Sequence, residues 1–156
     1  MNKFDFDNQQ KGSPLELLIA DDLHFHQIPF GFNPFTGTED PRRQDYDLYT
    51  GQPDEATLFE LKMDWQSGIT GNIFVEEKAL YNSKADKFVY GRLFLDVFDR
   101  QRLIEMYQAR EQGMHVYKRV TGGDQAHNSG MILNWRAVKE NSIPYWAMRK
   151  QLTQHA

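Results

Sequence analysis

The stretch Thr57-Leu58-Phe59-Glu60-Leu61-Lys62 decides how this chain folds. On an extended strand, successive side chains point to opposite faces of the sheet. Glu60 and Lys62 then share one face, and Phe59 and Leu61 share the other. We expect the apolar face to pack in the core, which leaves the charged face available for chemistry.

A second extended segment precedes this strand. Residues Gln44 to Thr50 alternate in character, and the turn residues between Gly51 and Ala56 follow them, which predicts a β-hairpin. A register that is symmetric about the Pro53-Asp54 bond gives four opposed pairs: Gly51 with Ala56, Tyr49 with Leu58, Asp47 with Glu60, and Asp45 with Lys62. Opposed side chains lie about 4.5–5.5 Å apart at Cβ. The same register puts Tyr46 and Leu48 on the apolar side of the hairpin.

Two carboxylates would meet in this hairpin. Opposed like charges destabilise a sheet unless something neutralises them, and a divalent cation between Asp47 and Glu60 would do so. Hard oxygen ligands suit Mg²⁺ or Mn²⁺, whereas zinc prefers histidine and thiolate. With Lys62 one step further along the same face, the pattern outlines a site for phosphodiester hydrolysis.

These residues resemble a known family. Asp47 followed by Glu60-Leu61-Lys62 is similar to the core of the PD-(D/E)XK nucleases, the restriction-endonuclease-like superfamily. Three further segments are similar to the run that follows the catalytic lysine in some phage and bacterial members: Lys62-Met63-Asp64, Thr70 to Glu76, and Ser83-Lys84-Ala85-Asp86. The similarity covers about residues 44 to 92. Tyr46 stands where the family motif has proline, and the literal Pro53-Asp54 lies in the predicted turn, too near Glu60 to face it.

The resemblance implies a single α/β domain over residues 14–156, with a restriction-endonuclease-like mixed central sheet flanked by helices. It implies a Mg²⁺-dependent deoxyribonuclease, with Mn²⁺ able to substitute, in which Asp47, Glu60 and the Leu61 carbonyl bind the metal. Lys62 would orient the attacking water and stabilise developing charge, because neighbouring carboxylates raise a lysine pKa and disfavour its use as a base. Asp45 either tethers Lys62 or serves as a metal ligand itself. DNA is the expected partner, and a homodimer is an open possibility.

Further residues are candidates for the same site. Glu16, on the first predicted helix, is either a second metal contact or the capping-box partner of Ser13. Arg42 and Arg43 either hold phosphates at the mouth of the site or are solvated. The remaining candidates, which would contact phosphate or support the metal ligands, are Thr70, Asn72 and Glu76. Asn72 has the alternative role of capping a turn.

The rest of the chain predicts an alternation of helices and strands. Residues 1–13 lack periodicity and predict a flexible arm, and residues 27–43 predict an ordered loop with buried aromatic residues. The expected elements are helices from Ser13 to His24, Arg100 to Gln112 and Pro144 to Gln154, and strands over Ile73–Val75, within Lys87–Phe98, over Met114–Val120 and over Met131–Val138. A helix capped by Thr70 is the alternative for the segment around Ile73.

Composition bounds these expectations. A chain of 156 residues with no cysteine has no disulfide framework and no thiolate site. It shows neither a membrane-spanning run nor a signal-peptide core, so a cytoplasmic protein is expected. The net charge of −4 is unevenly distributed along the chain: residues 1–99 have a net charge of −9, and residues 100–156 have a net charge of +5.

Two other interpretations stay open. A nuclease-like fold can bind nucleic acid or a protein partner without cutting. Alternatively, Glu60 and Lys62 are ordinary edge-strand charges of a soluble α/β protein.

Overall fold

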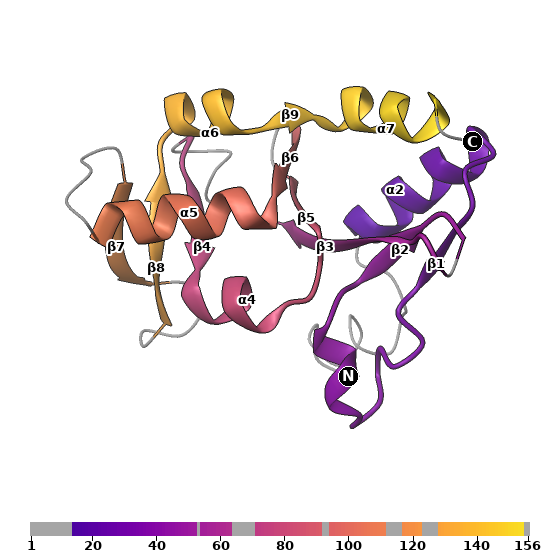
Figure 1. Ribbon diagram of the computed structural model, residues 1–156, viewed down its shortest axis with the longest axis horizontal. Coiled ribbons are helices and arrows are strands. Elements are labelled where there is room, and N and C mark those ends of the chain that lie inside the picture. The colour runs from indigo at the N-terminus through magenta and orange to yellow at the C-terminus, as the bar shows by residue number, and fades with distance from the viewer. Residues whose placement is uncertain are drawn as a thin grey trace.

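The computed structural model describes residues 14–52, 54–63, 71–91, 94–111, 117–122 and 128–154. Within them the chain forms an α/β fold with a mixed six-stranded sheet, a smaller three-stranded sheet and five α-helices (Figure 1). The predicted arm over residues 1–13 and the candidate Thr70 lie outside the described residues. No helix among the described residues has the length and apolar character that crossing a membrane requires.

The large sheet carries the predicted hairpin. Its strands, in spatial order, are β1 (Phe30–Phe32), β2 (Leu48–Thr50), β3 (Thr57–Met63), β5 (Lys87–Gly91), β6 (Leu95–Asp99) and β9 (Ile143–Pro144). Strands β3 and β5 are parallel, and every other neighbouring pair is antiparallel. Tyr49 pairs with Leu58 across β2 and β3, which confirms the predicted register for residues 48–50. The predicted pairs of Asp47 with Glu60 and of Asp45 with Lys62 lie beyond this ladder.

The first strand of the hairpin is shorter than predicted. Instead of a strand from Gln44, the chain makes a 3-10 helix, η1 (Pro41–Gln44), and β2 begins only at Leu48. Asp40 caps this turn by accepting a hydrogen bond from the Arg42 backbone N–H, and proline at the first position favours it. Strict alternation therefore stops before Leu48. As a result Tyr46 packs against the same apolar core as Leu58, on the face opposite to the one predicted.

The small sheet consists of β4 (Ile73–Glu76), β8 (Asn128–Leu133) and β7 (Tyr117–Gly122), all antiparallel. The strand expected at Ile73 is confirmed. The predicted strand over Met131–Val138 is wrong in its second half, because Asn134 ends it by accepting a hydrogen bond from the Ala137 N–H. That bond caps helix α6 (Trp135–Asn141).

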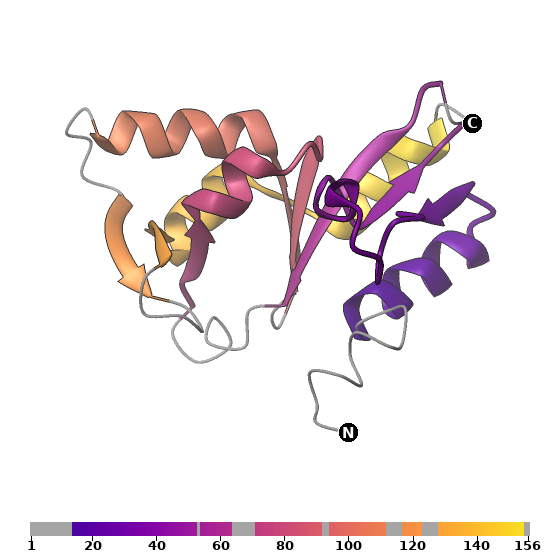
Figure 2. The same cartoon turned by 90° about the horizontal axis from the view of Figure 1, so that it is seen from below.

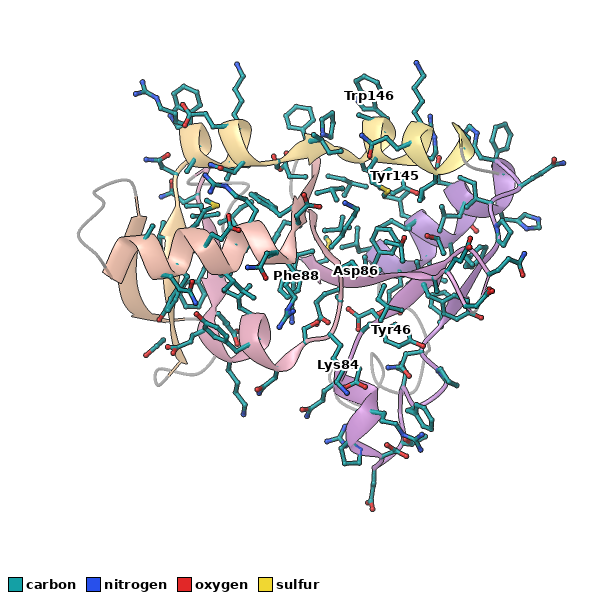
Figure 3. The ribbon with its side chains drawn as sticks, viewed as in Figure 1. Tyr46, Lys84, Asp86, Phe88, Tyr145 and Trp146 are labelled. Carbon is teal, nitrogen blue, oxygen red and sulfur yellow. The ribbon has the colours of Figure 1, made fainter. Side chains whose placement is uncertain are left out.

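Four more helices cover the two sheets: α2 (Pro14–Phe25), α4 (Glu77–Asn82), α5 (Arg100–Glu111) and α7 (Tyr145–Gln154). The predictions for α2, α5 and α7 are confirmed, whereas α4 was not expected. Helical spacing predicts that Leu18 in α2 and Trp146 in α7 face inward, but both face solvent, since Leu18 is 56% exposed and Trp146 is 58% exposed. Figure 3 shows Trp146 directed away from the sheet and Tyr145 directed towards it.

The large sheet separates two apolar cores. Along β5, Phe88 belongs to the core beneath α4, α5 and the small sheet, and the next residue, Val89, belongs to the core beneath α2 and α7. This is the alternation expected of a strand buried on both faces. Figure 2 shows the two groups of elements on either side of the large sheet. Phe59 lies in the second core, so the opposite face of β3, with Glu60 and Lys62, looks towards α4.

Candidate active site

The hairpin fixes Asp47 against β3. The backbone N–H of Asp47 donates to the Phe59 carbonyl at 2.8 Å, although Phe59 is already the partner of Leu48, so this bond anchors Asp47 just outside the β2–β3 ladder. The Asp47 Oδ2 atom accepts from the Leu61 N–H at 2.7 Å. Asp47 is thereby held beside Glu60, the residue that the predicted register places opposite to it.

Glu60 is held through both of its oxygens. Its Oε1 lies 3.2 Å from the Lys62 Nζ, and its Oε2 accepts a hydrogen bond from the Ser83 hydroxyl at 3.2 Å. The expectation that Asp45 tethers Lys62 is wrong, because Asp45 Oδ2 lies 3.5 Å from the Lys84 Nζ. Asp45 caps the C-terminal end of η1 instead of continuing the strand, so the extended register does not apply to it.

The charges of the site perturb one another. Burial raises the pKa of Asp47, and the neighbouring Glu60 carboxylate raises it further, to about 7, although the Leu61 N–H opposes this. Burial acts to lower the pKa of Lys62, but Glu60 and Asp47 outweigh it and the net shift is upward. The site therefore holds an ammonium group and a carboxylate that resists ionisation.

An open hollow of about 390 Å³ lies over these residues. We call the four lining residues that lie on or directly beside the strands its floor: Asp47, Glu60, Lys62 and Glu76. One wall comes from residues 36–44, before β2, and the other comes from α4 and Ser83. The residues of the two walls are Thr36, Gly37, Arg43 and Gln44 on the first, and Lys78, Ala79, Asn82 and Ser83 on the second.

The two candidate arginines differ in what they contact. The Arg42 guanidinium binds both carboxylate oxygens of Asp40, at 3.0 and 2.7 Å, and lies 3.9 Å from the centre of the Phe35 ring. Arg43 lines the hollow and is anchored through one nitrogen, which donates to the carbonyls of Glu39 and Asp40. Among the described residues, Arg43 therefore offers the better placed cation for an anionic substrate.

The remaining candidates fall into two groups. Glu76 lies in the floor of the hollow, and Glu16 is close enough to raise the pKa of Asp47. Asn72, half-buried just before β4, is not among the described residues that line the hollow. Its predicted phosphate contact stays a prediction.

The donors present fit a hard divalent cation. No group of three or more His, Asp or Glu side chains in the described parts of the chain is placed to hold a metal. Mg²⁺ commonly binds proteins through only one or two carboxylates and keeps several waters. Asp47 and Glu60 supply two carboxylates. The pKa of Asp47 is raised by burial first and by the Glu60 charge second, and a bound cation would oppose both effects. The Leu61 carbonyl stays the predicted third ligand.

Sequence reasoning missed two residues of the second wall. Lys78 is exposed on α4, a helix that was not predicted, so no pattern connected it with the site. Ser83 is only 4% exposed and was part of the segment similar to the nucleases, but nothing in the sequence indicated that it reaches Glu60.

Comparison with known proteins adds no assignment. No family model matches this chain, and no curated protein matches it significantly.

Proposed function

We propose that this protein is a metal-dependent nuclease that hydrolyses phosphodiester bonds of DNA. The observation that carries the proposal is that Asp47, directly before β2, and Glu60, on β3, lie beside Lys62 in the floor of one open hollow. An acidic pair that is merely structural would not be expected to keep a carboxylate with a pKa raised to about 7 beneath an open surface.

We assign the fold, as part of this proposal, to the restriction-endonuclease-like class. The hairpin of β2 and β3, with β5 parallel to β3 and helices over both faces, is compatible with a mixed central sheet of that kind. The motif residues lie directly before β2 and in the second half of β3, where a substrate can reach them through the hollow.

Each residue has a distinct role in the proposed reaction. Asp47 and Glu60 would hold Mg²⁺, which supplies a polarised phosphate and a bound water of lowered pKa. Lys62 orients the attacking water and offsets the charge that develops on the phosphate. Its raised pKa keeps it protonated, so it acts as an electrostatic group and not as the base.

The test is cleavage of supercoiled, linear, single-stranded and branched DNA in Mg²⁺, Mn²⁺ or EDTA. The informative variant is Lys62→Met, and the matched control is Lys87→Met. Lys87 also lies on a strand and also forms an ion pair, with Asp99 at 2.6 Å. We expect metal-dependent cleavage that Lys62→Met loses and Lys87→Met keeps. Binding of DNA without cleavage in any metal would favour a non-catalytic binding module, and neither binding nor cleavage would remove the proposal.

A further inference from the structure

Ser83 connects three parts of the site. As the C-cap of α4, it donates its backbone N–H to the Ala79 carbonyl at 3.1 Å. Its hydroxyl oxygen accepts the Ala85 N–H at 3.1 Å and lies 3.2 Å from both the Asp45 carbonyl and Glu60 Oε2. The side chain is therefore fixed in position before any substrate or metal arrives.

We propose that Ser83 is a positioning residue, which holds the Glu60 carboxylate in the orientation that binds the metal ion. The inference rests on the proposed function. It assigns to Ser83 no contact with the reacting atoms, only an effect through Glu60.

The single hydroxyl proton of Ser83 has two possible acceptors at equal distance. The Asp45 carbonyl already accepts the Lys84 N–H at 2.8 Å, whereas Glu60 presents an ionisable carboxylate. Hydrogen bonds to ionised acceptors are about twice as strong as those between neutral groups. The proton is therefore directed to Glu60, and the Asp45 carbonyl keeps its backbone donor.

Lys62 alone would not fix the Glu60 carboxylate. The Lys62 side chain is 38% exposed, and an ammonium group on a flexible stem forms bonds with little directional preference. Ser83 is buried and contacts the other oxygen, so the two donors together define the plane of the carboxylate. Each carboxylate oxygen has a second lone pair, which leaves Glu60 able to bind a cation while both contacts persist.

The variant that tests this role is Ser83→Ala, and Ser142→Ala is its matched control. Ser142 also caps a helix C-terminus, that of α6, but its hydroxyl donates to a backbone carbonyl, that of Val138 at 2.6 Å, and not to a carboxylate. Ser83→Thr keeps the hydroxyl. Thermal unfolding in EDTA measures the structural cost of each change, and calorimetric titration with Mn²⁺ in the absence of DNA measures metal affinity.

We expect Ser83→Ala to weaken Mn²⁺ binding about tenfold, in the range typical for loss of a group that orients a metal ligand. We expect Ser142→Ala to lower the unfolding temperature without changing Mn²⁺ affinity, and Ser83→Thr to retain most of the affinity. Equal Mn²⁺ affinity in Ser83→Ala and the wild type would overturn this inference and leave the nuclease proposal standing. A wild type that neither binds Mn²⁺ nor cleaves DNA would overturn both.

Discussion

At the scale of single residues, the charge of Asp47 links stability to pH. The raised pKa means that the folded state keeps a proton that the unfolded chain releases near pH 4. The resulting stabilisation is complete below about pH 4 and is lost as the pH rises through about 7. A change in pKa from 3.8 to about 7 corresponds to about 4 kcal/mol at most.

We therefore predict that Asp47→Asn stabilises the metal-free protein at alkaline pH. The amide oxygen can still accept the Leu61 N–H, and the repulsion from Glu60 is removed. Urea unfolding in EDTA should show little difference between variant and wild type at pH 4 and a growing advantage for the variant up to pH 8. Saturating Mg²⁺ should stabilise only the wild type. An advantage that is the same at pH 4 and pH 8 would contradict the assignment of the raised pKa.

A second residue-scale prediction separates two neighbouring arginines. Arg42 is engaged by Asp40, whereas Arg43 is anchored by neutral carbonyls at the edge of the hollow. In the cleavage-deficient Lys62→Met background with Mg²⁺, we expect Arg43→Ala to weaken DNA binding several-fold. The slope of log affinity against log salt should fall by about 0.9, the value for one lost phosphate contact. Fluorescence anisotropy with labelled DNA measures both quantities. Arg42→Ala should leave them unchanged, and an equal effect of the two substitutions would count against this distinction.

At the scale of elements, the small sheet supports one wall of the site through a close approach of two strands. Gly130 on β8 pairs with Glu76 on β4. A Cβ atom at Gly130 would collide with the Val75 carbonyl oxygen and lie 2.8 Å from the Phe74 ring. Because the carbonyl belongs to the backbone, a larger residue requires β4 to move.

We predict that Gly130→Ala lowers the free energy of unfolding by about 1–3 kcal/mol, the usual cost of overpacking. Ser129→Ala, at the adjacent and less buried position, should cost less than 1 kcal/mol, as most substitutions away from the core do. Urea unfolding measures both changes. If Gly130→Ala and the wild type had the same urea midpoint, β4 and β8 would be able to move apart without a loss of stability, which would contradict this prediction.

The elements that were predicted correctly are those whose boundaries are marked by residues nearby in the sequence. The β2–β3 register followed from a short turn, and α2 from a proline at its start. By contrast, η1 replaced part of a strand because the Asp40 side chain caps the turn, an effect that polarity alternation does not report. Helix α4 has six residues, too few for a periodic pattern to identify.

The same limit explains which site residues could be predicted. Glu60 and Lys62 lie on one strand, and Asp47 comes directly before the strand that pairs with it, so the hairpin alone predicts that the three lie near one another. The bonds that fix Asp47, to the Phe59 carbonyl and from the Leu61 N–H, lie outside that ladder. Ser83 reaches Glu60 only because α4 and its C-terminal end return to the sheet before β5, a packing event without a local signal. Tyr46 was misplaced for the opposite reason, since a local pattern was extended beyond the strand that justified it.

At the scale of the whole molecule, charge is unevenly distributed around the large sheet. Figure 1 shows α6 and α7 along one edge of the molecule, and α4 and η1 along the opposite edge. In Figure 3, Lys84 lies in the same half as η1, and Trp146 lies in the other. The basic residues of α6 and α7 are not among the described residues that line the hollow, although they are four of the nine Lys and Arg residues between 100 and 156. Within the described residues, cations for phosphate at the hollow come from Arg43, Lys62 and Lys78.

We predict from this distribution that position, not total charge, governs DNA binding. Lys78→Ala and Lys139→Ala each remove one exposed lysine from a helix, so they change the net charge of −4 equally. Only Lys78→Ala, which removes a lysine from the wall of the hollow, should weaken DNA binding and reduce its salt dependence, because counterion release requires direct contact with phosphate. Anisotropy titrations over a range of salt concentrations, again in the Lys62→Met background, measure both effects. An equal loss of DNA affinity in the two variants would mean that DNA also contacts the edge formed by α6. The hollow would then not be the specific binding site of the DNA backbone.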